Sequence, residues 1–129
     1  MSQYFRIKKG SVLPSLRMEL VDDGRYGFMK RDTYNKAIQN AEISFSMRNE
    51  KGELKVSNAK ANIVLPKDNC CNESYIIEYL WKERDTREEG MFEGEFEIFF
   101  KDDIKEEGVT FPSGKLIMPI NEKLMIHVI

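Results

Sequence analysis

The most regular pattern of apolar and polar positions in this sequence lies between residues 75 and 100. In its first part every second position is large and apolar: Tyr75, Ile77, Tyr79 and Trp81. In its second part the same period recurs, and one side is formed by Phe92, Gly94, Phe96, Ile98 and Phe100. A period of two is typical of β-strands with one buried and one solvated face. Because the charged link over residues 83–90 ends in glycine, the pattern predicts a β-hairpin with an aromatic inner face.

Shorter stretches of the same alternation predict further strands on both sides of this hairpin. We place them at residues 4–9, 16–20, 41–48, 54–65, 115–119 and 123–129. Residues 25–37 are mixed, with a brief strand at 26–30 and a loop with a helical turn over 32–39, and residues 101–108 fit a charged turn. Seven to nine short strands at this spacing, without a long helix, predict an all-β fold built as an antiparallel β-sandwich. The predicted core comprises Phe45, Tyr79, Trp81, Phe92, Phe96 and Ile98.

The composition fits one globular domain over residues 1–129. The chain is 41% hydrophobic and 33% charged, and it is long enough to bury a core. Its 20 basic and 22 acidic residues are interleaved and give a net charge of −2, so we expect no basic face for nucleic acid. The sequence has no apolar run of signal-peptide length and none of the roughly 20 apolar residues of a membrane span. We therefore expect a protein made in the cytosol, with neither nucleic acid nor membrane as a partner.

Few residues stand in a pattern that carries chemistry. Cys70 and Cys71 are adjacent, and since a vicinal disulfide is strained we expect two free thiols, with a redox switch as the alternative. Asp22–Asp23 and Asp102–Asp103 lack the further spaced oxygen ligands of a calcium loop. His127 is the only histidine, and no nucleophile is spaced to partner it, which favours a structural or surface role. The residues thus predict no enzyme, no cofactor and no metal site.

An aromatic platform for sugar is an alternative that the sequence leaves open. Tyr26, Phe28 and Tyr34 supply the rings for it, although the same side chains fit a role in covering the sandwich. A free-standing carbohydrate-binding module is therefore the second hypothesis for the function of this chain.

Four spaced motifs carry a resemblance to a family of phage proteins. They are FRIKKGSVLPSLRMEL at residues 5–20, IQNAEISFSMRNEKG at 38–52, YLWKERDTREEGMFEGEFEI at 79–98 and TFPSG at 110–114. In this order and spacing they resemble the N-terminal domain of the phage baseplate upper protein and related tail-associated immunoglobulin-like domains. The chain departs from that pattern at Asn40, where the family has glycine, and at Phe92, where it has tyrosine.

The resemblance implies an immunoglobulin-like sandwich and a structural role in a tailed-phage virion. Such a protein would be a non-enzymatic adaptor or docking subunit in the tail, baseplate or neck, or at a fibre attachment point. Its partners would be other virion proteins in a symmetric ring or fibre. We expect the terminal strands to be sheet edges that make the contact. The candidate docking residues are Tyr4, Phe5, Ile7, Met125 and Ile129.

Overall fold

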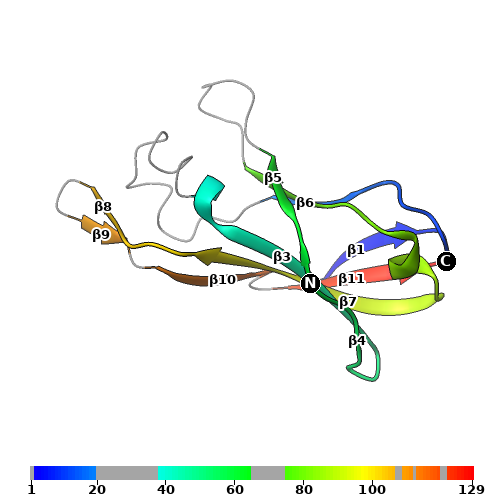
Figure 1. Cartoon of the computed structure of the whole chain (residues 1–129). Helices are drawn as coiled ribbons and strands as arrows, with labels where there is room; N and C mark the ends of the chain where they lie inside the picture. The colour runs from blue at the N-terminus through cyan, green and yellow to red at the C-terminus, as the bar shows by residue number, and fades with distance from the viewer. Residues whose placement is uncertain (1, 20–37, 65–74, 107–108, 112, 120–121) are drawn as a thin grey trace.

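The computed structural model describes residues 2–19, 38–64, 75–106, 109–111, 113–119 and 122–129, and it is an all-β sandwich (Figure 1). The predicted all-β fold is confirmed. The described residues form eleven strands rather than seven to nine, because β5, β8 and β9 are only three residues each. A 3₁₀ helix, η1 (Glu83–Thr86), lies between the sixth and seventh strands. The strands are β1 (Ser2–Ile7), β2 (Leu16–Glu19), β3 (Glu42–Asn49), β4 (Leu54–Lys60), β5 (Asn62–Val64), β6 (Ile76–Tyr79), β7 (Gly90–Phe100), β8 (Ile104–Glu106), β9 (Val109–Phe111), β10 (Gly114–Met118) and β11 (Lys123–Val128).

The larger sheet is organised around β7, which is eleven residues long. On one side β3 pairs with β7 from Glu42↔Phe99 to Asn49↔Phe92. On the other side β11 pairs with the first half of β7 and β10 pairs with the second half. The strand order is β1-β11-β7-β3-β4, with β10 also beside β7. The smaller sheet has the order β2-β6-β5, and β8 and β9 form a separate two-stranded ribbon.

The core lies between the two sheets and follows the predicted alternation. All six predicted core residues are buried in one cluster. The ring of Phe45, on β3, lies 4.6 Å from that of Tyr79 on β6 and 5.1 Å from that of Phe96 on β7, centroid to centroid. Aromatic pairs at these separations contribute beyond their buried area. Rings from both sheets therefore meet at the centre of the sandwich.

The predicted hairpin over residues 75–100 is wrong, although its inward faces are correct. Tyr75, Ile77, Tyr79 and Trp81 are all buried, as are the apolar positions of β7. However, β6 belongs to the smaller sheet and β7 to the larger one. The link between them contains η1, and it carries the chain from one sheet to the other rather than turning it back within one sheet. The two aromatic faces consequently meet across the core instead of lying side by side.

The segment predicted as one or two strands over residues 54–65 also changes sheets. β4 pairs with β3 in the larger sheet, and β5 pairs with β6 in the smaller one. At the crossing, the backbone N–H of Ala61 donates to the carbonyl oxygen of Ile43 at 2.9 Å, and the Ala61 side chain is buried. Ala61 therefore marks the crossing between the two sheets. Beyond it β5 continues in the smaller sheet while β3 lies in the larger one.

Two further expectations about the strands need correction. Residues 101–108 are not only a charged turn, because β8 lies within them and pairs with β9. The sheets are also not wholly antiparallel, since β1 runs parallel to β11. Of the uncertain segment before β3, residues 25–37 lie outside the described residues, while residues 38–40 are helical.

Candidate functional site

The structure brings together two of the five predicted docking residues on the outer face of the larger sheet. β1 is the last strand of that sheet, as expected for an edge. Tyr4 on β1 is paired in register with Met125 on β11, and the Tyr4 side chain is 71% exposed while that of Met125 is half-buried. The expectation that the last strand is also an edge is wrong, because β11 lies between β1 and β7.

The other predicted docking residues do not join this pair. Phe5 and Ile7 share a face as expected, but that face points into the sandwich. Phe5 stacks on Trp81 with ring centroids 5.8 Å apart, and Ile7 is only 2% exposed. Ile129 is 47% exposed just beyond β11, where its backbone N–H donates to the carbonyl oxygen of Ile7. Ile7 is therefore a core residue and not a surface contact.

Three residues that the prediction did not include also lie on the outer face near Tyr4 and Met125, as does the exposed Glu93, which is paired with Met125. Arg6 is paired with His127, and His127 is paired with Met91 on β7. Arg6 is exposed, and His127 and Met91 are half-buried. We call Tyr4, Arg6, Met91, Met125 and His127 the β1 surface. The alternation of the last strand is the signal that places Met125 and His127 on one face, whereas their pairing with β1 and Met91 cannot be seen in the sequence.

The edge of β1 is open within the described part of the chain. β11 is the one strand that pairs with it there, so its other side has backbone donors and acceptors without a partner strand. Basic side chains follow this edge, because Arg6, Lys8 and Lys9 are exposed and no acidic residue occurs between Ser2 and Gly10. An open edge can accept an added strand from another chain, and the positive charge favours an acidic one.

The end of β1 is fixed by η1. The backbone N–H of Gly10 donates to the carbonyl oxygen of Thr86 at 2.9 Å. The buried Thr86 hydroxyl donates to the carbonyl oxygen of Ser11, also at 2.9 Å. These bonds anchor the segment that follows β1 to η1, so the end of β1 is held in place.

A buried carboxylate in turn holds η1. The Tyr79 hydroxyl donates to Oδ2 of Asp85 at 2.5 Å, and the backbone N–H of Lys82 donates to the same oxygen at 2.9 Å. Short distances of this kind are usual for a hydroxyl on a carboxylate. Burial, together with the bond to Asp85, raises the pKa of Tyr79 well above its ordinary value. The phenol therefore stays protonated and acts as a structural donor.

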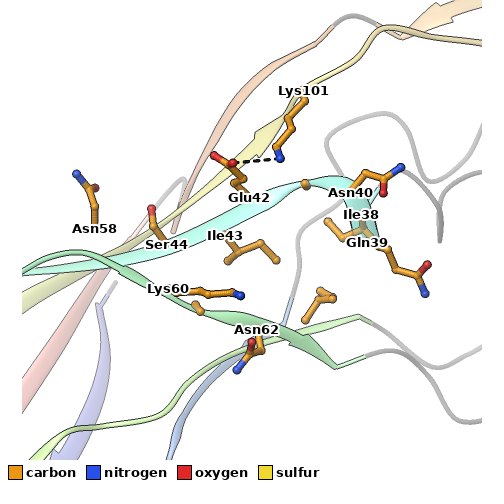
Figure 2. A pocket seen from close by; sticks show the side chains of 13 residues that line it. Ile38, Gln39, Asn40, Glu42, Ile43, Ser44, Asn58, Lys60, Asn62 and Lys101 are labelled. Atoms are coloured by element: carbon orange, nitrogen blue, oxygen red, sulfur yellow. Dashed lines mark ion pairs between the residues drawn. The ribbon is translucent and has the colours of Figure 1, made fainter.

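A second feature is a groove of about 690 Å³ where β3 and β5 diverge (Figure 2). Its aliphatic part includes Ile43 and Ala61, which are buried, and Ile63, which is half-buried. Figure 2 shows Gln39 and Asn40 on the helical turn at one end and Lys60 and Asn62 along β4 and β5. The groove thus has polar walls over an apolar base. Neither the alternation nor the spaced motifs of the sequence predicted it.

The groove also contains an ion pair. Nζ of Lys101 lies 3.1 Å from Oε1 of Glu42, and Figure 2 shows this pair on the wall formed by β3 and β7. The side chains of Lys101 and Glu42 are 47% and 69% exposed, so the pair contributes little to stability. Lys60 has no ion pair with any residue that the structure describes.

The other residues that the sequence analysis considered for chemistry form no metal site among the described residues. No group of three His, Cys, Asp or Glu side chains is placed there to hold a metal ion. The backbone N–H of Ser113 donates to Oδ1 of Asp103 at 2.6 Å and holds the pKa of that carboxyl below its ordinary value, which gives Asp103 a structural role.

None of the helices in the described part of the chain has the length and apolar character of a membrane span. Cys70 and Cys71, Asp22–Asp23 and the aromatic set Tyr26, Phe28 and Tyr34 lie outside the described residues.

Comparison with known proteins gave no match of any kind: no protein-family model, no curated protein and no solved structure is similar to this chain.

Proposed function

We propose that this protein is a non-enzymatic structural subunit of a tailed-phage virion, which docks onto neighbouring virion proteins through β1. The observation that carries the docking role is the open, basic edge of β1 beside the exposed ring of Tyr4. The place in a virion rests on the four spaced motifs and their resemblance to phage tail-associated domains.

The strand order supports the immunoglobulin-like part of that resemblance. In an immunoglobulin variable domain one sheet contains strands G, F, C and C′ in sequence, and the other contains B, E and D. Here the larger sheet has the order β11-β7-β3-β4 and the smaller one has the order β2-β6-β5. Assigning β2 through β7 in order to strands B, C, C′, D, E and F, and β11 to strand G, gives the same neighbours in both sheets, while β8, β9 and β10 have no counterpart in that assignment.

Docking by strand addition fits the chemistry of this edge. A partner strand beside β1 would pair with its free backbone groups, while Tyr4 and Met125 would offer apolar contact on the outer face. Tyrosine is enriched among the residues that dominate binding energy at interfaces. Arg6, Lys8 and Lys9 would orient the partner by charge, an effect that salt weakens.

The test is incorporation of a variant into virions. Tyr4→Asp combined with Arg6→Glu changes two exposed side chains and should leave the fold intact by circular dichroism. Loss of an interface anchor costs about 2 kcal/mol or more, which weakens binding roughly thirtyfold, so the variant should be missing from purified virions. A matched control on the opposite edge, Leu54→Asp with Lys51→Glu, should be incorporated normally.

Two results would contradict the proposal, and they are distinguishable. If the β1 variant is incorporated as well as the unchanged protein, the docking surface lies elsewhere on the molecule. If the unchanged protein itself is absent from virions, its place in a virion is wrong whatever β1 binds.

A further inference from the structure

The groove between β3 and β5 has hydrogen-bonding groups without a partner among the described residues. Gln39, Asn40 and Asn62 are exposed at its walls, and their carboxamides make no hydrogen bond with any residue that the structure describes. Each carboxamide combines two N–H donors with a carbonyl acceptor. Sugar hydroxyls both donate and accept, so a set of carboxamides can bind neighbouring hydroxyls of one ring.

The base of the groove suits the apolar side of a sugar ring. Ile63 is half-buried there, beside the buried Ile43 and Ala61. A pyranose ring has carbon-bound hydrogens on its faces, and these pack against aliphatic side chains while the hydroxyls at its rim bind polar groups. The volume of about 690 Å³ falls within the range of about 300–1,000 Å³ that is usual for small-molecule sites.

The charges at the groove favour an anionic ligand. Its lining holds two ammonium groups, Lys60 and Lys101, and one carboxylate, Glu42. Because Glu42 is paired with Lys101 and Lys60 has no ion pair among the described residues, the ammonium of Lys60 can bind a carboxylate or another anionic group of a ligand. A charge-assisted hydrogen bond is about twice as strong as a neutral one.

We propose that this groove binds an acidic saccharide of one or two rings. The carboxamides of Gln39, Asn40 and Asn62 bind its hydroxyls, Ile63 contacts its ring, and Lys60 binds its acidic group. This site is separate from the β1 surface, and it does not depend on the docking role or on a virion.

The side-chain amides report on the site directly in a ¹H–¹⁵N NMR titration of the full chain. The probes are two acidic sugars, galacturonate and glucuronate, with galactose and glucose as their neutral counterparts. We expect at least one acidic sugar to shift the amide signals of Gln39, Asn40 and Asn62, with an affinity about tenfold higher than that of its neutral counterpart.

Two lysine variants give the matched control. Lys60→Met should reduce the affinity for the acidic sugar about tenfold, to that of the neutral one, because it keeps an unbranched side chain of similar length and removes the ammonium group. Lys55→Met, on the same strand but outside the groove lining, should leave the affinity unchanged. The proposal is overturned if no sugar shifts the three amide signals, if neutral sugars bind equally well, or if the two lysine variants behave alike.

Discussion

Gly94 shows how the space at one residue limits what the core accepts. Met47 on β3 and Leu124 on β11 are its partners in the larger sheet. A Cβ atom at this position would lie 2.7 Å from Cδ1 of Ile126 and 2.9 Å from Cε1 of Phe45. Both distances are shorter than normal van der Waals contact, so glycine is needed here for space.

We expect Gly94→Ala to destabilise the protein by about 1–3 kcal/mol, since the added methyl group must displace Ile126 and Phe45. Denaturant unfolding measures this free energy. The control is a double-mutant cycle with Ile126→Val, which removes the Cδ1 atom at 2.7 Å and by itself costs about 0.5–1.5 kcal/mol. Gly94→Ala should cost less in that background, and an equal cost in both backgrounds would show that Ile126 is not the obstacle.

At the scale of the element, η1 joins the smaller sheet to the end of β1. Tyr79 at the end of β6 donates to Asp85 in η1, and Thr86 in η1 binds the backbone at Gly10 and Ser11. Asp85 is buried and accepts from Tyr79 and from the backbone of Lys82. The Asp85 carboxylate therefore links the end of β6 to η1, and η1 in turn is hydrogen-bonded to the segment that follows β1.

Tyr79→Phe should reduce the free energy of unfolding by about 1–3 kcal/mol, because it removes a donor from the buried Asp85 carboxylate. Its pH dependence is a second readout. The pKa of Tyr79 is raised by folding from an ordinary value of 10.0, so above this pH the unfolded chain loses a proton that the folded chain keeps. Stability from this group is thus complete below pH 10 and falls as the pH rises further.

Unfolding midpoints in denaturant, measured at a series of pH values above and below 10, separate the contribution of the hydrogen bond to Asp85 from that of the raised pKa of Tyr79. The unchanged protein should lose stability more steeply above pH 10 than Tyr79→Phe does. Tyr4→Phe, which removes an exposed hydroxyl, should follow the unchanged protein throughout. Parallel curves for the unchanged protein and Tyr79→Phe would contradict the raised pKa of Tyr79.

At the scale of the whole molecule, alternation predicted which residues face inward but not which strands pair. The inward positions of residues 75–81 and 92–100 were correct, because burial on one face imposes a period of two wherever a strand lies. The hairpin between them was wrong, since the same alternation is produced by strands that pair and by strands that face each other across a core. What distinguishes the two cases is the link over residues 83–90, where Asp85 and Thr86 bond to Tyr79, Gly10 and Ser11. These are tertiary contacts, and the local sequence pattern does not reveal them.

The same limit explains the result for the candidate docking residues. The terminal position of β1 correctly suggested a sheet edge, and the alternation correctly put Phe5 and Ile7 on one face. Alternation alone does not say which face is the inner one, because Tyr4 and Arg6 on the other face have the same period. The groove between β3 and β5 depends on a crossing between sheets at Ala61, so no local pattern could reveal it.

β1 has one face in the core and one exposed face, which we propose binds a partner, so substitutions on the two faces should have different effects. Ile7→Ala should lower the free energy of unfolding by about 2–5 kcal/mol, because Ile7 is buried in the core. Tyr4→Ala should change it by no more than about 0.5 kcal/mol, because Tyr4 is exposed, yet it should weaken docking. Denaturant unfolding of both variants, with incorporation measured for Tyr4→Ala, checks this. A loss of stability in Tyr4→Ala as large as in Ile7→Ala would mean that both faces of β1 are structural, and that the partner binds elsewhere.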